Sequence, residues 1–255
     1  MADQLSNIVK TKYGDLIPCS GASDYRKKYR CPVDHYDNGN VKSVYLEEPQ
    51  NIDLPEGTFQ AELITFYEDG NVKRIFPLYG QLSAFWSLEE ELEFAPYYDF
   101  CLDGSSVRIR PQCLYFYPSG KIRSITLWPT DKLEIKTPIG TVITTLGIEL
   151  HENGSIRSIE PIPGTVITTP FGEVRPFIYK ELMLHAEDSS LTFDDKGELT
   201  GLSTICSSLE HNGVVIKPSG INSPLSIKIR DKEILVRLND SDIRINTSLE
   251  EVRFR

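Results

Sequence analysis

The sequence lacks the features that mark several large classes of protein. It has five cysteines in 255 residues, and none is part of a Cys-x-x-Cys pair. The spacing therefore indicates neither a secreted disulfide framework nor a zinc site. No apolar run is long enough to span a membrane. The first ten residues lack a basic stretch followed by an apolar one, so we expect no signal peptide and a cytoplasmic location.

Basic residues are also in short supply. The chain has 27 Lys and Arg against 37 Asp and Glu, which gives a formal net charge of −10. Nucleic acids and anionic membranes are bound through a basic surface, so the acidic balance argues against either as the main partner. The sequence has no Gly-x-Ser-x-Gly elbow, no P-loop and no dinucleotide fingerprint. It therefore predicts no catalytic residue and no cofactor.

What the sequence does contain is one short phrase, repeated along the chain. An aromatic residue or His is followed by two polar residues, Gly, any residue, an aliphatic, a base, a small or basic residue and a second aliphatic. Asn-Gly and Asp-Gly between apolar runs are strong hairpin signals, because Gly tolerates the positive φ of a tight turn. The copies are Tyr36–Val44, Tyr67–Ile75, Tyr117–Ile125 and His151–Ile159, with a weaker fifth at Phe193–Leu202 that has one extra residue before its Gly.

A second kind of turn alternates with the first. It has Pro at the first corner and Gly at the close, and it occurs at 54–57, 137–140 and 169–172. The alternation predicts a meander of short antiparallel strands. The two aliphatic residues of a phrase lie three apart, so in a regular strand they would face opposite sides. Either both faces of the sheet are covered, or a Gly bulge shifts the register.

Longer spacings indicate a duplication. Cys19 and Cys31 are twelve positions apart, as are Cys101 and Cys113, and glycines at 39–80 recur at 120–164. We interpret 19–82 and 101–166 as two copies of one unit, and expect the matched cysteines to be buried free thiols at equivalent positions. The predicted organisation is one continuous repeat domain. Its parts are a first unit with an acidic helix at 1–100, a second at 101–176, and a decayed third unit with a C-terminal cap at 177–255.

The predicted fold class is all-β, an open meander or solenoid-like sheet of antiparallel hairpin repeats. One short helix is expected near 87–94, where Ser87-Leu-Glu-Glu90 fits a capping box. Near the C-terminus, Leu225 and Ile227 alternate with Ser226 and Lys228, which predicts strands with one wet face. An open sheet has two edges to protect. We expect the charged strand 251–255 to guard one, and the segment 8–13 to be covered by the chain or paired with a partner.

The hairpin phrase, aromatic-x-x-Gly-x-aliphatic-basic-Ser, resembles the MORN-like repeats of bacterial proteins that are often labelled antitoxin components. The resemblance covers the five phrases only. It implies an elongated sheet of stacked hairpins that serves as an interaction surface, and it supplies no catalytic residues. Eukaryotic relatives associate with membrane lipids, but the acidic charge of this chain opposes that role.

Two groups of residues are candidate binding sites. The bases of four phrases, if the hairpins stack, would form a column suited to an anionic partner: Lys42, Lys73, Arg123 and Arg157. The alternative is a solvated face paired with Glu47 and Glu160. The aromatic and acidic segment 85–98, with Trp86, Tyr97 and Tyr98, would be a protein-binding edge. Its alternative is a helix that packs Trp86 against the sheet.

Histidines give no strong site. No two of the four lie at ligand spacing; His185, Glu187 and Asp188 could contribute metal ligands, and the alternative there is an exposed loop. We therefore predict a cytosolic β-repeat binding or scaffolding module whose partner is another protein, with the oligomeric state left open. The alternative is a hydrolase with a site in a groove of the sheet, which a pocket joining His and carboxylates would favour.

Overall fold

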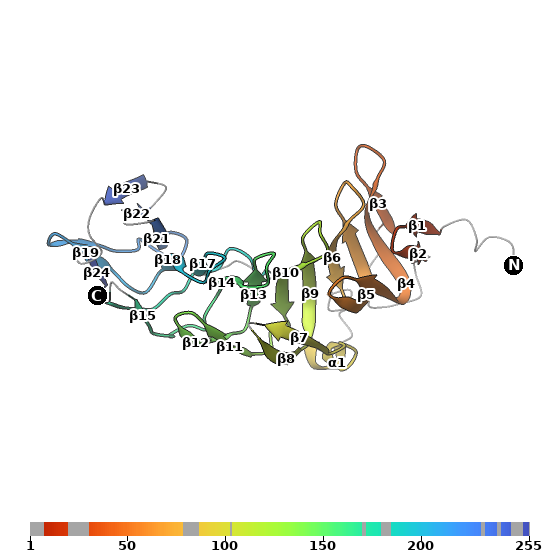
Figure 1. Ribbon diagram of the computed structural model, residues 1–255, viewed down its shortest axis with the longest axis horizontal. Coiled ribbons are helices and arrows are strands. Elements are labelled where there is room, and N and C mark those ends of the chain that lie inside the picture. Colours follow the sequence, from red (N-terminus) through yellow and green to blue (C-terminus); the bar gives the residue numbers. More distant parts are fainter. Residues whose placement is uncertain are drawn as a thin grey trace, which may run out of the picture. The chain divides into compact units, whose positions relative to one another are not determined.

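The computed structural model describes residues 8–19, 31–78, 87–102, 104–169, 172–179, 185–230, 233–238, 241–245 and 252–254 (Figure 1). The chain divides into two compact units. The first unit holds residues 1–100 and 106–125, and the second holds 101–105 and 126–255.

The first unit is built from strands and one short helix. Its main sheet has the hydrogen-bonded order β3-β4-β5-β6-β9, and β1 pairs with β2 in a separate hairpin. Three strands contribute residues to both units: β7 (Tyr98–Leu102), β8 (Ser105–Ile109) and β10 (Ile122–Leu127). The other elements are β1 (Val9–Thr11), β2 (Gly14–Leu16), β3 (Val33–His35), β4 (Val41–Leu54), β5 (Gly57–Phe66), β6 (Val72–Phe76), α1 (Leu88–Glu93) and β9 (Pro111–Phe116).

In its described part, the second unit contains strands and the turns that join them, but no helix. Its main sheet has the order β13-β14-β17-β18-β21-β22-β23, and the remaining strands form the small sheets β11-β12, β15-β16 and β20-β19-β24. The elements are β11 (Leu133–Thr137), β12 (Gly140–Thr144), β13 (Gly147–Leu150), β14 (Ile156–Ile159), β15 (Ile167–Thr169), β16 (Gly172–Val174), β17 (Leu191–Phe193), β18 (Leu199–Thr204), β19 (Leu209–His211), β20 (Val214–Ile216), β21 (Leu225–Arg230), β22 (Glu233–Leu238), β23 (Ser241–Ile245) and β24 (Val252–Phe254).

All five phrases close the same turn. In the first, Tyr36 N–H donates to the Asn40 carbonyl at 2.8 Å, and Gly39 N–H donates back to the Tyr36 carbonyl at 2.9 Å. The same two bonds recur in the other four copies, and φ of the glycine lies between 78° and 88° in all five. The predicted hairpins are thus confirmed. In the fifth copy Asp194 takes the first position of the turn, so this turn has the same length as the others. Our prediction of an extra residue before its Gly is wrong.

A β-bulge adjoins the turns, which decides between the two alternatives for the aliphatic pair. His35 pairs with Val41 but Asp34 pairs with Ser43, so Lys42 is the extra residue. The same shift occurs in the second, fourth and fifth hairpins. Because one residue is bulged out, the two aliphatic residues of a phrase face the same side although they lie three apart.

That side carries the core of each unit. In the first, the cross-strand partners Val44, Ile64, Ile75 and Leu114 are each 0% exposed. In the second, an equivalent row crosses six strands and is at most 2% exposed: Ile148, Ile159, Leu191, Leu202, Ile227 and Val236. Four of the five phrases therefore contribute an aliphatic side chain to one of these rows, and burying such a side chain contributes about 1.5–3 kcal/mol.

A Thr hydroxyl defines a second recurring turn. The Thr137 hydroxyl donates to the Gly140 carbonyl at 2.7 Å, and that of Thr169 to Gly172 at 2.9 Å. The N-terminal hairpin uses the same device, with Thr11 bonded to Gly14 at 2.8 Å. Pro is therefore not essential to this turn, since Lys12 stands at the first corner there.

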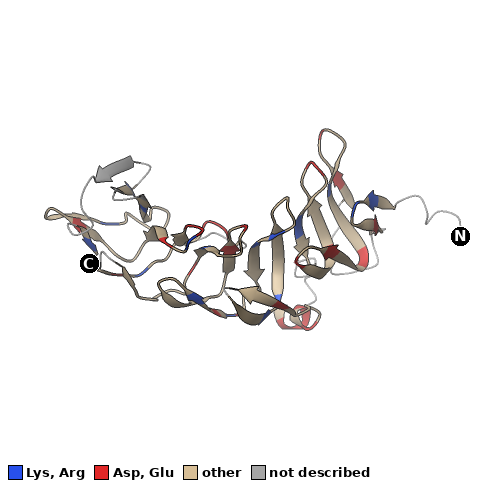
Figure 2. Cartoon of the chain, viewed as in Figure 1, with Lys and Arg blue, Asp and Glu red and all other residues tan. Residues whose placement is uncertain are grey.

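The predicted acidic helix is confirmed as α1. Ser87 accepts a hydrogen bond from Glu90 N–H at 3.2 Å, and the Glu90 carboxylate accepts one from Ser87 N–H at 2.7 Å, which completes the capping box. Figure 2 shows the acidic residues gathered on this helix. No helix in the described part of the chain is long and apolar enough to cross a membrane.

The edges differ in part from expectation. The C-terminal strand β24 pairs with β19 in a separate small sheet, so it does not guard an end of the main sheet; β23 is the last strand there. At the other end the last strand is β3, and the segment 8–13 is not an edge of the main sheet, because β1 pairs with β2 in a separate hairpin. The chain that follows this hairpin bonds to β4: Cys19 N–H donates to the Tyr45 carbonyl at 2.8 Å, and Glu47 N–H to the Ile17 carbonyl at 3.0 Å. Among the described residues, neither unit has a sheet whose first and last strands pair.

The cysteines are free thiols as predicted, but the prediction that all four matched cysteines are buried is wrong. Cys113 is buried, but Cys31 and Cys101 are exposed and Cys19 is half-buried. Cys113 stands four residues before its turn at Tyr117, whereas Cys31 stands five before Tyr36. Since side chains alternate along a strand, this difference of one position removes Cys31 from the equivalent place.

Candidate functional site

The predicted basic column is largely engaged by the hairpins themselves. The Lys42 and Lys73 ammonium groups lie 5.8 and 5.6 Å from the ring centroids of Tyr36 and Tyr67, the first aromatic of their own phrases. Arg123 repeats this over Tyr117 at 5.8 Å. Such cation–π contacts contribute about 0.5–1 kcal/mol at exposed sites. These bases occupy equivalent places in successive hairpins of the first unit, and their contacts there are structural.

Arg157, the fourth member of the column, belongs to the second unit. Its Nε lies 3.7 Å from Glu149 Oε1. Glu160, which we expected as a partner of the column, is 4% exposed and accepts from Ile178 N–H at 3.0 Å and from Ser190 N–H at 2.7 Å. The expected pairing is replaced because the Glu160 side chain is buried against backbone amides.

Two tyrosines of the predicted aromatic segment 85–98 have different surroundings. Tyr98 packs against Phe59, with ring centroids 5.3 Å apart, and its hydroxyl accepts from Gln60 N–H at 2.9 Å. Burial raises the pKa of the Tyr98 hydroxyl. Tyr97 is 51% exposed, with the guanidinium groups of Arg108 and Arg110 over its ring. Trp86, which we predicted to pack against the sheet or to form part of a protein-binding edge, lies outside the described residues.

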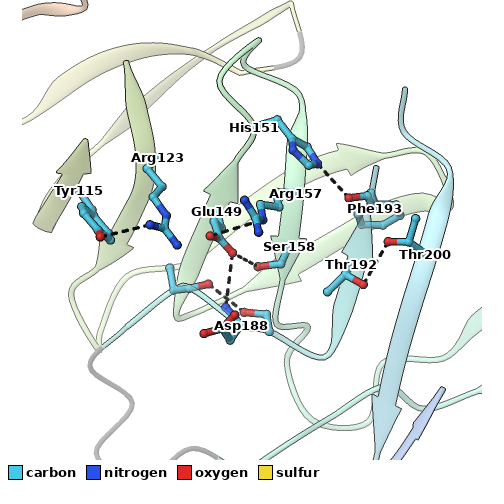
Figure 3. Close-up of polar contacts among 12 residues, drawn as sticks. Tyr115, Arg123, Glu149, His151, Arg157, Ser158, Asp188, Thr192, Phe193 and Thr200 are labelled. Atoms are coloured by element: carbon cyan, nitrogen blue, oxygen red, sulfur yellow. Dashed lines mark hydrogen bonds and ion pairs between the residues drawn. The ribbon is translucent and has the colours of Figure 1, made fainter. Parts of the chain in front are cut away.

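The first residue of a phrase also links one hairpin to the next. The Tyr36 hydroxyl donates to the Phe66 carbonyl at 2.7 Å, and the Tyr67 hydroxyl donates to Phe116 at 2.8 Å. In the second unit, His151 Nε2 bonds the Phe193 carbonyl at 2.9 Å (Figure 3). The polar tip of each ring therefore ties its turn to the strand beside it.

Buried carboxylates form a structural network in the second unit (Figure 3). Glu149 is 2% exposed and accepts from the Ser158 hydroxyl at 3.0 Å and from Asp188 N–H at 3.5 Å. Within 185–188, His185 and Asp188 are exposed but Ala186 and Glu187 are buried, so our alternative of an exposed loop is correct only in part. The described residues contain no group of three or more His, Cys, Asp or Glu that could hold a metal ion.

A row of small hydroxylated residues crosses the opposite face of this sheet from the aliphatic core. Ser203 and Ser226 are cross-strand partners whose hydroxyls lie 2.9 Å apart, and Thr192 pairs with Gly201 on neighbouring strands. Two hollows adjoin along this row and share Ser203 and Ser226. One measures about 180 Å³ and the other about 700 Å³. We call them together the hydroxyl groove, lined by Tyr179, Ser190, Thr192, Gly201, Ser203, Ile221, Ser226 and Lys228.

Ser190 is the unusual residue of the groove. It lies at the smaller hollow and is 1% exposed, yet its hydroxyl has no hydrogen-bond partner in the described part of the chain. Leaving a buried hydroxyl unsatisfied costs about 1–3 kcal/mol, so such groups are rare in native proteins. Gly201 lets the Thr192 side chain approach closely, because a Cβ at position 201 would lie 2.6 Å from the Thr192 hydroxyl oxygen and 3.3 Å from the Ile227 carbonyl oxygen.

The two ends of the groove differ in chemistry. The larger hollow is bordered by Tyr179 and Ile221, which are 52% and 58% exposed. The smaller hollow is bordered by Lys228, the cross-strand partner of Gly201, and by Arg237, the partner of Ser226. Both cations are exposed, and among the described residues no acidic side chain lines either hollow.

The sequence reasoning missed this groove. The alternation at 225–228 did place Ser226 and Lys228 on the wet face, and Leu225 and Ile227 are buried as predicted. The other lining residues come from separate strands, so no local spacing could assemble them. A usable signal was the run of small polar residues Ser189, Ser190 and Thr192 next to a phrase whose base is replaced by Thr200.

No protein-family model, curated protein or solved structure matches this chain. The choice between a binding module and a hydrolase therefore rests on the site itself. At the Glu149 network, the Ser158 hydroxyl donates to a carboxylate, while the nearby His151 ring bonds a backbone carbonyl. A nucleophile activated by His needs the ring nitrogen at the hydroxyl. That arrangement is not made by these residues.

Proposed function

We propose that the chain is a cytosolic β-repeat binding module that takes an extended segment of another protein in the hydroxyl groove. The observation that carries this proposal is the Ser190 hydroxyl, which is buried, lies at the smaller hollow and has no hydrogen-bond partner in the described part of the chain. A bound segment would supply the missing partner. The hydroxyls of Ser203 and Ser226 offer further hydrogen bonds to the amide groups of a peptide.

The apolar end of the groove supports a protein partner over a small polar solute. Tyr179 and Ile221 are large, exposed and border the same hollow. Aromatic side chains at the centre of a recognition surface contribute much of the binding energy in protein interfaces. The MORN-like resemblance, which implies an interaction surface, agrees with this proposal.

The test uses the full chain and an array of immobilised random peptides. We expect the double substitution Tyr179→Ala and Ile221→Ala to weaken binding of the retained peptides by about tenfold or more, since hot-spot residues cost about 2 kcal/mol or more when truncated. Both side chains are exposed, so the fold should survive. Val214→Ala, at a residue of β20 that is 64% exposed and outside the groove, is the matched control.

Two outcomes would overturn the proposal. One is that the wild-type chain retains no peptide from the array. The other is that the double variant and Val214→Ala bind the retained peptides equally well.

A further inference from the structure

The smaller hollow has the composition of an oxyanion site. Its floor offers the hydroxyls of Ser190, Thr192 and Ser226, and its mouth is bordered by the cations Lys228 and Arg237. Hydroxyl and ammonium donors are the groups that bind carboxylate and phosphate oxygens, and a charged acceptor makes such bonds stronger than neutral ones. We propose that this hollow binds a carboxylate or phosphate group carried by the bound protein segment, an inference that rests on the proposed function.

The strand register explains why the donors converge. Gly201 pairs with Thr192 on one side, through β17 and β18, and with Lys228 on the other, through β18 and β21. These three positions form one lateral row, so they face the same side of the sheet. Because Gly201 has no side chain, the Thr192 hydroxyl can lie close to it, and the adjoining hollow of about 180 Å³ has room for a group the size of an oxyanion.

Charge and burial favour an anion over a neutral group. The chain as a whole carries a net charge of −10, yet the described lining of the hollow contains two cations and no acidic residue. The buried Glu160 carboxylate accepts from the backbone amides of Ile178 and Ser190 at 3.0 and 2.7 Å, while the Ser190 hydroxyl has no hydrogen-bond partner in the described part of the chain. The Ser190 hydroxyl is therefore available as a donor to an incoming anion.

The probes are inorganic phosphate and acetate, added to the full chain at constant ionic strength. Binding is followed by the amide NMR signals of Gly201 and Lys228 and by the thermal midpoint, which a ligand of the native state raises. We expect saturable binding of at least one probe. Lys228→Gln should weaken it by about three- to fivefold, the effect of one exposed ion pair, and Lys228→Arg should retain it. Lys217→Gln, which removes an exposed cation elsewhere in the unit, should change nothing.

Ser190→Ala separates a ligand-binding role from a structural one. A hydroxyl without a partner adds nothing to folding, so this variant should unfold at the same or a higher temperature than wild type, yet lose the stabilisation by phosphate or acetate. Ser158→Ala is the matched control, since Ser158 is also 1% exposed but is bonded to Glu149 at 3.0 Å. It should lower the thermal midpoint and keep the response to the anion.

The outcomes distinguish this inference from the proposed function. If phosphate alone binds, the partner group is a phosphate; if acetate binds as well, it is a carboxylate or phosphate. The oxyanion site is overturned if neither binds, or if Lys217→Gln weakens binding as much as Lys228→Gln. In that case the proposed function would still hold, provided that the double variant Tyr179→Ala and Ile221→Ala binds the retained array peptides more weakly than the wild-type chain.

Discussion

At the scale of single residues, the first position of each phrase does more than fill space. Tyr36 and Tyr67 place a ring under a cation of their own hairpin and a hydroxyl on a carbonyl of the next one. His151 keeps the second contact with its ring nitrogen. In the fifth phrase Asp194 instead accepts from Lys196 N–H at 3.0 Å and Glu198 N–H at 2.8 Å within its own turn. The link between hairpins thus needs an aromatic or His with a polar tip.

This role predicts the effect of removing one hydroxyl. Tyr67→Phe keeps the ring but leaves the Phe116 carbonyl without its donor, so we expect the free energy of unfolding to fall by about 1 kcal/mol. Urea denaturation followed by circular dichroism measures it. Tyr97→Phe is the control, because Tyr97 is half exposed and should be neutral. Equal losses in the two variants would show that the hydroxyl does not link the hairpins.

At the scale of elements, the repeating unit is a hairpin with a Gly turn and an adjoining bulge. The turn conformation is the same in all five copies, but the surroundings of the glycine are not. At Gly70 nothing lies within 4 Å of a Cβ, whereas at Gly120 a Cβ would meet Pro55 Cδ at 2.8 Å. The φ values are nearly equal, 78° and 84°. A comparison of Gly70 with Gly120 can therefore distinguish the cost of backbone strain from the cost of a steric clash.

Alanine substitutions at the two glycines test this separation. Gly70→Ala should lower the free energy of unfolding by about 1 kcal/mol, the cost of a left-handed conformation for a residue with a Cβ. Gly120→Ala should cost more, because the same strain is joined by a clash with a ring that is part of the β4–β5 connection. Urea denaturation of both variants gives the comparison. An equal loss at the two sites would mean that the Gly120 turn does not pack on Pro55.

At the scale of the whole molecule, open sheets leave edges that the chain must protect. In the first unit the N-terminal segment does so: Pro18 bridges to Leu46, and residues on either side bond to β4. Cys19 also packs on the buried pair Tyr45 and Leu63. Unpaired backbone and exposed apolar side chains at an edge favour pairing with another chain.

A truncation tests that protection. Removing residues 1–19 uncovers the Tyr45 and Glu47 backbone and the Tyr45–Leu63 cluster, so the shortened chain should self-associate as its concentration rises. Light scattering after size-exclusion chromatography detects this. Removal of residues 1–7 alone, which leaves β1, β2 and Cys19 in place, should leave the wild-type behaviour unchanged. Identical elution of the two truncated chains at all concentrations would contradict the role.

What the sequence by itself determined are the local features. The Gly turns, the capping box of α1 and the wet and dry alternation at 225–228 follow from φ preferences, backbone capping and side-chain period, all of which act over a few residues. An all-β fold of open, antiparallel hairpins could therefore be predicted, and the observed strand order confirms it.

Only the tertiary structure decided the features that depend on register between strands. The bulge turned the aliphatic pairs to one side. Strand pairing buried Cys113 but not Cys31, and packing set Glu160 against the amides of Ile178 and Ser190. The hydroxyl groove is of the same kind. Ser190, Ser203 and Ser226 meet because β17, β18 and β21 lie side by side in one register. The local alternation can indicate which face of its own strand a residue occupies, but it does not indicate which strands pair or which residues meet across them.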